Sequence, residues 1–443
     1  YTRTSALFPA LQPVPAEDFP FLPDCAAAAG AALQQITLPD WLPEAVLLEA
    51  RTLSQRCTYS FTAMRPEAVR ALYGRTIPLS ASKIDRFAGC RYAFFLQYGL
   101  RAAPWKQAEF DAPLFGSFVH DVLEHVVRAA QENGGFAAMT DGEISALTER
   151  CMDACMGTYL PQGEAAASRE RYLSARNRQE AAAVVMDVAR ELRLSQFAPA
   201  AEELRFAPGG PLPPIEYRAK SGSGLLTGQI DRVDIYEADG TRYFRIIDYK
   251  TGHKDFDYAE LLYGKNLQML LYLFALESYQ KQTGQPMQPA GVLYVPSRCD
   301  MVKLKPGEDP AHADNERRKD LRRKGLVLND EAVLHAMESY EKKPQYLPFE
   351  HGPDGLAGDL ASPAQLAELE RFVTGQVESM IDEILSGVTA PNPISRGPSD
   401  TECKYCDFSS ACHKDVCSVN TRRFASVTPE EFWQELERRL EHG

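Results

Sequence analysis

The sequence predicts an α/β fold in which a small sheet with a β-hairpin is embedded in many helices. The hairpin is indicated by two segments, 225–236 and 242–249, that are rich in β-branched and aromatic residues. Asp239 and Gly240 stand between them, and this pair favours the tight turn of a hairpin. On both sides of the hairpin, longer segments have the capping residues and the apolar spacing of helices.

The chain has 443 residues, enough for two or three domains. We expect 1–76, which is rich in Pro and Ala, to be a wrapping segment or the end of a preceding domain, and 77–443 to form the main domain. The elements expected in the main domain begin with a helix that Ser80 or Ser82 caps and that extends to Tyr98. Further helices are expected at 116–130, 142–158, 168–197 and 258–282, with a strand at 291–295 and a last helix that opens at 428–430.

The net charge of −13 argues against a protein coated with basic surface for nucleic acids, although a carboxylate-rich metal site would itself be acidic. One basic cluster stands out, and it is either a DNA-holding patch or a solvated helical face. Its members are Arg317, Arg318, Lys319, Arg322, Arg323 and Lys324. No apolar run approaches the length of a membrane span, and the small-residue stretch 26–33 lacks the basic leader of a signal peptide, so we expect a cytoplasmic location.

The densest group of candidate catalytic residues lies on the hairpin. Asp248 and Lys250 are two residues apart at the end of an apolar strand, so their side chains emerge on the same face. Asp231 lies on the partner strand and can approach them. Two carboxylates bind hard cations such as Mg²⁺, which activate water, and an ammonium beside them stabilises charge that develops on a phosphate. This group predicts phosphodiester hydrolysis, and the alternative is an ordinary salt bridge on a surface hairpin.

Two pairs with helical spacing could complete this site. His120 and Glu124 are four residues apart and share one helical face, so His120 could bind a metal through an imidazole nitrogen. Gln268 and Tyr272 are also four apart, on the helix after the hairpin, and could hold a nucleic-acid backbone by hydrogen bonds. Taken alone, each of these residues is more often part of a core or a surface.

Three of the ten cysteines fall within ten residues near the end of the chain, which indicates a metal site. They are Cys403, Cys406 and Cys412. The fourth ligand is open. His413 or Cys417 would give a local site that favours zinc, whereas Cys90 is a distant candidate at the start of a helix.

Together these motifs resemble the PD-(D/E)xK nuclease superfamily, and more closely the C-terminal nuclease domain of AddB-type subunits of bacterial helicase–nucleases. The resemblance runs from about 79 to 417 and rests on Leu79–Cys90, Phe115–His120, Gly228–Asp234, Ile247–Gly252, Gln268–Tyr272 and the terminal cysteines. It implies a restriction-endonuclease-like core sheet. The centre that it implies comprises His120, Asp231, Asp248 and the Tyr249 carbonyl as metal ligands, Lys250 beside the attacking water, and Gln268 and Tyr272 in an additional motif. One departure is Ile230, which stands where the superfamily's name has Pro.

The resemblance also implies cofactors and partners. Mg²⁺ (or Mn²⁺) would serve catalysis, and a [4Fe–4S] cluster would be held by Cys90, Cys403, Cys406 and Cys412. The implied activity is cleavage of single DNA strands, including the strand that ends 5′, during double-strand break repair with an AddA-like helicase–nuclease subunit. Residues 1–76 would then be the end of the helicase-like part. The sequence has no phosphate-loop motif, so we do not expect this chain alone to hydrolyse ATP. A non-catalytic module that binds DNA ends and a zinc-stabilised scaffold are the alternatives.

Overall fold

The computed structural model describes residues 43–48, 51, 63–103, 112–159, 168–252, 254–298, 318–352, 355–412 and 420–442. The chain divides into two compact units. The larger comprises Pro66–Ala88, Ala103–Ser386 and Phe424–Gly443, and the smaller includes Gly89–Ala102 and Gly387–Arg423. The expected domain boundary after residue 76 stays a prediction. No described helix combines the length and the apolar character that crossing a membrane requires.

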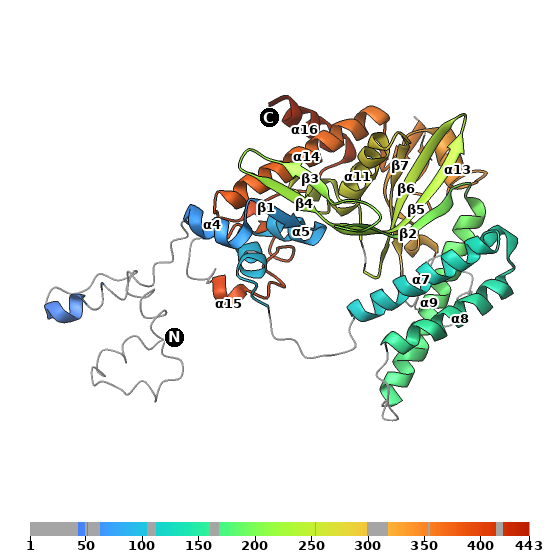
Figure 1. Cartoon of the computed structure of the whole chain (residues 1–443), viewed down its shortest axis with the longest axis horizontal. Coiled ribbons are helices and arrows are strands. Elements are labelled where there is room, and N and C mark those ends of the chain that lie inside the picture. The colour runs from blue at the N-terminus through green and yellow to red at the C-terminus, as the bar shows by residue number, and fades with distance from the viewer. Residues whose placement is uncertain are drawn as a thin grey trace. The chain divides into compact units, whose positions relative to one another are not determined.

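The larger unit is built around a six-stranded mixed sheet (Figure 1). In order across the sheet, its strands are β11 (Leu360–Ala361), β8 (Lys324–Leu328), β7 (Gln288–Pro296), β6 (Thr241–Lys250), β5 (Gly228–Ala238) and β2 (Ala198–Phe206). β6 runs parallel to β7, whereas β5 with β6 and β7 with β8 are antiparallel. β5 and β6 form the predicted hairpin, and Asp239 and Gly240 at its turn have φ values of 50° and 76°, in the left-handed region that a primed turn requires.

Helices cover both faces of this sheet. α11 (Gln268–Gln282) packs on β6 and β7. α9 (Ser168–Leu194) lies on the other face, because its Glu191 pairs with Arg245 of β6, whereas Asp248, three residues further along the strand, bonds to Gln268 of α11. α7 (Ala112–Glu132) packs on α8 (Asp141–Tyr159), on α9 and on β2. Both α7 and α11 can therefore bring side chains to the ends of β5 and β6.

Three smaller sheets and several short helices complete the described residues. In the larger unit these elements are α4 (Pro66–Tyr73), β1 (Thr76–Leu79), α5 (Ala81–Gly89), η3 (Phe136–Ala138), β3 (Ile215–Arg218), β4 (Ser223–Leu226), α10 (Tyr258–Leu262), α13 (Glu331–Met337), β9 (Phe349–Gly352), β10 (Gly355–Gly358), α14 (Pro363–Leu385) and α16 (Pro429–His442). In the smaller unit they are α6 (Arg91–Phe94), η2 (Phe95–Gly99), β12 (Ile394–Ser395), α15 (Ser409–Cys412) and β13 (Arg422–Arg423).

The single helix expected over 258–282 is wrong, because the chain breaks it into α10 and α11. Gly264 and Asn266 lie between the two helices with φ values of 81° and 57°, which a right-handed helix cannot contain. Asn266 is held there, since its N–H donates to Asp85 Oδ1 at 2.9 Å. The break sets the start of α11 at Gln268, which brings that side chain to the end of β6.

Candidate active site

The β5–β6 hairpin opens at the end where the candidate residues lie. The pairing of the two strands stops at Arg232 and Ile247. Beyond that point the Tyr249 N–H donates to Oδ2 of Asp231 at 2.8 Å, so a side-chain carboxylate takes the place of a strand partner. Asp231 and Asp248 therefore meet at the open end, and the charge of Asp231 helps to raise the pKa of Asp248.

α7 brings His120 to this end of the hairpin. Gly116, one turn earlier, lets the helix approach, since a Cβ added there would lie 3.3 Å from Cγ2 of Thr251. His120 Nε2 lies 2.7 Å from the Tyr249 carbonyl oxygen, and its Nδ1 lies 3.5 Å from Oδ2 of Asp231. A carbonyl oxygen only accepts hydrogen bonds, so Nε2 carries the proton. In the neutral ring the Nδ1 lone pair then faces the Asp231 carboxylate.

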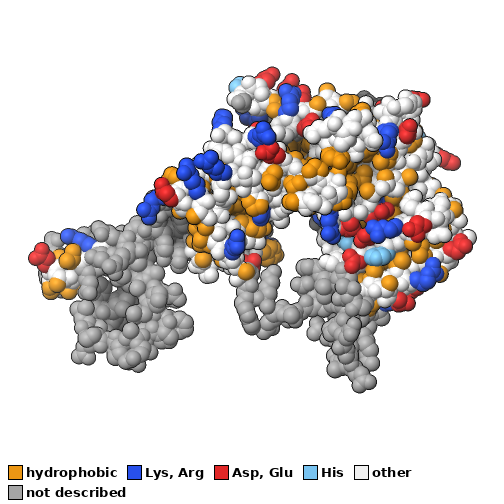
Figure 2. Space-filling view, viewed as in Figure 1, with side chains coloured by type: hydrophobic (Ala, Val, Ile, Leu, Met, Phe, Trp, Pro, Cys, Tyr) orange, Lys and Arg blue, Asp and Glu red, His pale blue; other side chains and the backbone are white. Residues whose placement is uncertain are grey.

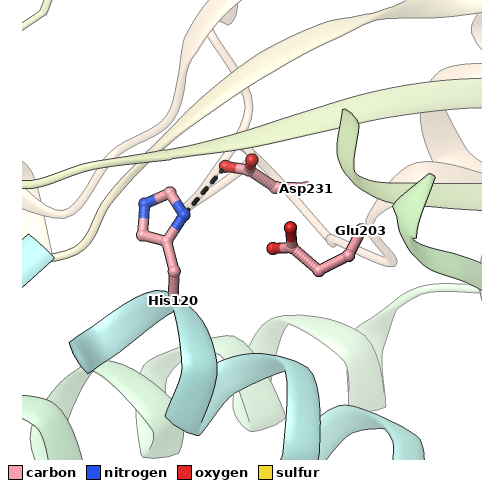
Figure 3. Close-up of side chains that lie close together, drawn as sticks. All are labelled: His120, Glu203 and Asp231. Atoms are coloured by element: carbon pink, nitrogen blue, oxygen red, sulfur yellow. Dashed lines mark ion pairs between the residues drawn. The ribbon is translucent and has the colours of Figure 1, made fainter. Parts of the chain in front are cut away.

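Glu203 of β2 is a site residue that the sequence reasoning missed. Figure 3 shows its carboxylate facing the side chains of His120 and Asp231, and the potential ligand atoms of these three residues all lie within 4.8 Å of one another. Among the described residues this is the one such group. Glu203 has a φ of 51°, a left-handed conformation that is uncommon for a non-glycine residue and costs it energy. Burial, followed by the charge of Asp231, raises the pKa of Glu203 to about 7. Glu124, by contrast, pairs with Arg128 at 2.6 Å.

Asp248 and Lys250 lie together, as the strand alternation predicts. Lys250 Nζ is 2.6 Å from Oδ2 of Asp248, and Gln268 Nε2 donates to the other carboxylate oxygen at 3.2 Å. The Asp248 side chain is only 5% exposed, and burial is the main reason why its pKa rises to about 6. Lys250 and Asp248 form a close ion pair, and the charge of Lys250 partly offsets the rise that burial causes in the pKa of Asp248.

Tyr272 supports the start of β5. Its ring stacks on Phe206 with 5.8 Å between the centroids, and the side chain is buried. A Cβ added at Gly228 would collide with the Tyr272 hydroxyl, so only glycine fits at that position of β5. Burial raises the pKa of Tyr272 to about 12. The structure thus places Tyr272 beneath the strand that carries Asp231, whereas Gln268 reaches the centre itself.

A buried charge network lies directly behind this centre. Arg232 donates to Asp234 at 2.7 and 3.0 Å and to the Tyr249 hydroxyl at 2.6 Å. Arg245 joins the network through Asp234 at 2.9 Å and Glu191 at 3.2 Å. Because Arg232 follows Asp231 and Tyr249 separates Asp248 from Lys250, the network fixes the strand positions from which the catalytic candidates project.

This network corrects the interpretation of the basic cluster. Arg323 is fully buried, and its guanidinium binds Glu191 at 2.7 Å and Asp187 at 2.5 Å. It therefore belongs neither to a DNA-holding patch nor to a solvated helical face. Residues 318–320 are helical, but strand β8 begins at Lys324. In the part of the cluster that the structure describes, the expected helical face therefore does not continue past residue 320. Arg317 lies outside the described residues.

The donor set at the open hairpin fits a hard divalent cation. It offers the carboxylates of Asp231 and Glu203 and one imidazole nitrogen, the ligand types that Mg²⁺ and Mn²⁺ accept, whereas Asp248, expected as a ligand, is not part of this close group. One feature calls for a positive charge: when the His120 ring is neutral, its Nδ1 lone pair faces the Asp231 carboxylate at 3.5 Å. The Nε2–H bond to the Tyr249 carbonyl is the orienting contact that metal-binding histidines usually make. Acidic and histidine side chains also gather near α7 and β2 in Figure 2.

In the smaller unit, the segment of Cys90 lies beside the segment of the later cysteines. Cys90 is the N-cap of α6, and both it and Cys406 pack against a small core of Ala93, Leu96 and Phe408. A Cβ added at Gly89 would meet the Glu402 carboxylate at 2.7 Å. Segments far apart in the sequence thus adjoin. The thiols of the four described cysteines, however, are not as close together as the ligand atoms of His120, Glu203 and Asp231, which lie within 4.8 Å of one another. His413 and Cys417 lie outside the described residues.

Comparison with known proteins identifies the class. Residues 78–413 match the PD-(D/E)XK nuclease superfamily, so the chain belongs to that superfamily and the predicted fold class is confirmed. Among individual proteins, it is similar to those named as the B-type subunit of an ATP-dependent helicase/deoxyribonuclease. It is 32% identical to the protein from Acetivibrio thermocellus over 357 residues, 30% to that from Caldanaerobacter subterraneus over 357, and 28% to that from Clostridium kluyveri over 391.

These alignments cover 79%, 78% and 84% of this chain but only 31%, 30% and 33% of the relatives. The chain therefore spans about a third of the length of the curated relatives that it matches. Two solved structures, from Eubacterium rectale and Vibrio cholerae, align with TM-scores of 0.33 and 0.15 and identities of 11% and 14%. The alignments cover 81% and 62% of this chain and 94% and 58% of the chains in those two structures. Structural similarity this low supports no inference about function.

Proposed function

We propose that this chain is a Mg²⁺- or Mn²⁺-dependent deoxyribonuclease domain that hydrolyses phosphodiester bonds of single DNA strands. One observation carries the proposal: His120, Glu203 and Asp231 gather at the open end of one hairpin, beside the ion pair of Asp248 and Lys250, in a chain of a nuclease superfamily. This arrangement includes both candidate ligands for a cation and an ammonium that can stabilise the charge that develops in hydrolysis. A salt bridge on a surface hairpin would need only Asp248 and Lys250.

Each of these residues has a separate role in hydrolysis. A bound divalent cation would lower the pKa of a water and neutralise charge on the phosphate. Asp231, Glu203 and His120 would hold that cation, and the Tyr249 carbonyl fixes the His120 ring by accepting from Nε2. Hydrolysis joins the water oxygen to phosphorus and breaks the bond to the leaving strand oxygen, which then takes up a proton. Lys250 Nζ, held beside Asp248, orients the water or stabilises the extra negative charge.

The names of the relatives support a wider proposal. They are called subunits of ATP-dependent helicase/deoxyribonucleases, and this chain matches about a third of their length. We infer that it works in the cytoplasm as part of a helicase–nuclease, beside an AddA-like subunit that supplies the ATP-driven motor. Its substrate would be the single strands released at a double-strand break, including the strand that ends 5′.

For the smaller unit we propose a structural [4Fe–4S] cluster held by Cys90, Cys403, Cys406 and Cys412. The adjoining segments around Gly89 and Glu402 support this ligand set, because Cys90 and the later cysteines come from the same small unit. Such a cluster would close a loop of roughly 310 residues, worth at most about 5–6 kcal/mol by the loop-entropy estimate used for disulfides. That is comparable to the net stability of a domain, roughly 5–15 kcal/mol.

A cleavage assay tests the catalytic proposal. End-labelled single-stranded DNA is incubated with the purified chain, with Mg²⁺ or with EDTA, and Lys250→Ala is the inactive control. We expect shortened products only for the unaltered chain with Mg²⁺. A chain that binds the DNA but never cuts it is instead a DNA-end-binding module, and one that neither binds nor cuts, but contains zinc, is a scaffold; either result overturns the proposal.

A further inference from the structure

A basic pocket adjoins the candidate active site at the same edge of the sheet. β6 and β7 are parallel and end there, and β8, antiparallel to β7, begins there. These three strand ends, together with residues 319–322, enclose a pocket of about 370 Å³. Six cationic side chains line it, namely Lys250, Lys254, Arg298, Lys319, Arg322 and Lys324.

The charge of this pocket contrasts with the rest of the chain. Among its lining residues the six cations face a single carboxylate, that of Asp320, whereas the whole protein has a net charge of −13. At the surface Lys324 lies 3.4 Å from Asp255 and Arg322 lies 2.8 Å from Glu350, and Arg322 also donates to the backbone oxygens of Leu347 and Phe349 at 2.9 and 2.6 Å. Those two carboxylates are more than half exposed, so solvent screens the pairs and they contribute little. An incoming anion can therefore compete for Lys324, whereas the backbone bonds hold the Arg322 guanidinium in place as a fixed positive charge.

The size and the position of the pocket limit what it can hold. A volume near 370 Å³ is at the small end of ligand pockets, so it suits one phosphate with part of its nucleotide and is too small for a duplex. Lys250 both lines the pocket and contacts Asp248 of the catalytic centre. An anion bound in the pocket thus lies next to the position where a scissile phosphate would sit.

Resting on the proposed nuclease function, we propose that this pocket binds a phosphodiester group of the single strand, adjacent to the one that is cut. Lys319, Lys324 and Arg298 would hold that phosphate, with the fixed charge of Arg322 beside them, and Lys250 would stand between the phosphate and the catalytic centre. The pocket would thereby fix the strand in register with the catalytic centre. This gives the acidic protein a local basic site for the strand.

The first experiment measures the salt dependence of single-strand binding, in EDTA so that nothing is cut. Lys319→Gln combined with Lys324→Gln should flatten the slope of log K against log salt by about 1.4, because each phosphate contact contributes about 0.7 for single strands. The matched control is Arg218→Gln with Arg438→Gln, which removes two exposed charges of the same unit away from the pocket. An unchanged slope in the pocket variant, or an equal change in the control, overturns the proposal.

The second experiment locates the phosphate along the strand. Neutral methylphosphonates replace single phosphodiesters one at a time, and binding to the unaltered chain should weaken most at a position next to the cleavage point. In the Lys319→Gln, Lys324→Gln variant that loss should disappear, because the removed charges were its cause. A pocket that serves free phosphate would show no dependence on position, and that result rejects the proposal. Cleavage by the unaltered chain distinguishes failure of this proposal from failure of the nuclease proposal. If the chain cuts DNA but methylphosphonates weaken binding equally at all positions, the phosphate pocket is wrong and the nuclease function is still supported.

Discussion

Breaking the buried charge network behind the active site should strongly destabilise the larger unit. Asp234 accepts from Arg232 at 2.7 and 3.0 Å and from Arg245 at 2.9 Å, and the three side chains are at most 1% exposed. Asp234→Ala leaves two buried guanidiniums without this carboxylate, and removing one partner of a buried ion pair costs about 3–5 kcal/mol. At roughly 2–4 °C per kcal/mol, thermal unfolding should move down by roughly 6–20 °C.

Glu435 provides the matched control. Its carboxylate also binds two arginines, Arg438 and Arg439, each at 2.7 Å, but it lies on the surface with 28% of the side chain exposed. Exposed pairs contribute about 0–1 kcal/mol, so Glu435→Ala should shift the melting temperature by only a few degrees. Thermal unfolding followed by circular dichroism measures both variants. Equal shifts in melting temperature would refute the argument that burial makes the Asp234 network contribute more to stability than the exposed Glu435 pairs.

The remaining predictions concern the two proposed metal sites. Asp248→Ala and Lys250→Ala should each slow single-strand cleavage by on the order of 100-fold or more without unfolding the protein, and near-normal single-turnover rates in both would reject the assignment. Burial raises the pKa of Asp248 to about 6 and that of Glu203 to about 7, above the values near 4 of the unfolded chain. The folded, metal-free protein therefore binds more protons than the unfolded one between about pH 4 and pH 7, so its stability should fall as the pH rises through that window. Stabilisation by Mg²⁺ should accordingly be larger at pH 8 than at pH 5.5, and an equal gain in melting temperature at both would contradict this. Cys90→Ala should remove the brown colour and the bound iron, whereas Cys417→Ala should not. A colourless protein that contains one zinc, and keeps it in Cys90→Ala, would instead favour a local zinc site completed by His413 or Cys417.

The local parts of the site could be predicted from the sequence. The hairpin follows from two β-rich segments around Asp239 and Gly240, and the alternation of a strand is enough to place Asp248 and Lys250 on one face. Helical spacing also selected His120. These inferences need only neighbours in the chain, which is why they agree with the structure.

The parts that depend on distant neighbours could not be predicted. Glu203 faces His120 only because β2 pairs with β5, and glutamate is not a residue that signals a strand. Arg323 is indistinguishable in sequence from its exposed neighbours, and its burial depends on Glu191 of α9, 132 residues away. The break before α11 requires Asp85 to hold Asn266, a contact across 181 residues. Charge and periodicity within a short window do not contain this information.

The central claim is that the open end of the β5–β6 hairpin holds a divalent cation. Titration of the metal-free chain with Mn²⁺, followed by the loss of the electron paramagnetic resonance signal of free Mn²⁺, tests it without any DNA. The unaltered chain and Glu435→Ala should bind the ion alike, whereas Asp231→Asn and Glu203→Gln should each weaken the binding by at least tenfold, about 1.4 kcal/mol. Equal Mn²⁺ binding by all four proteins would contradict the account.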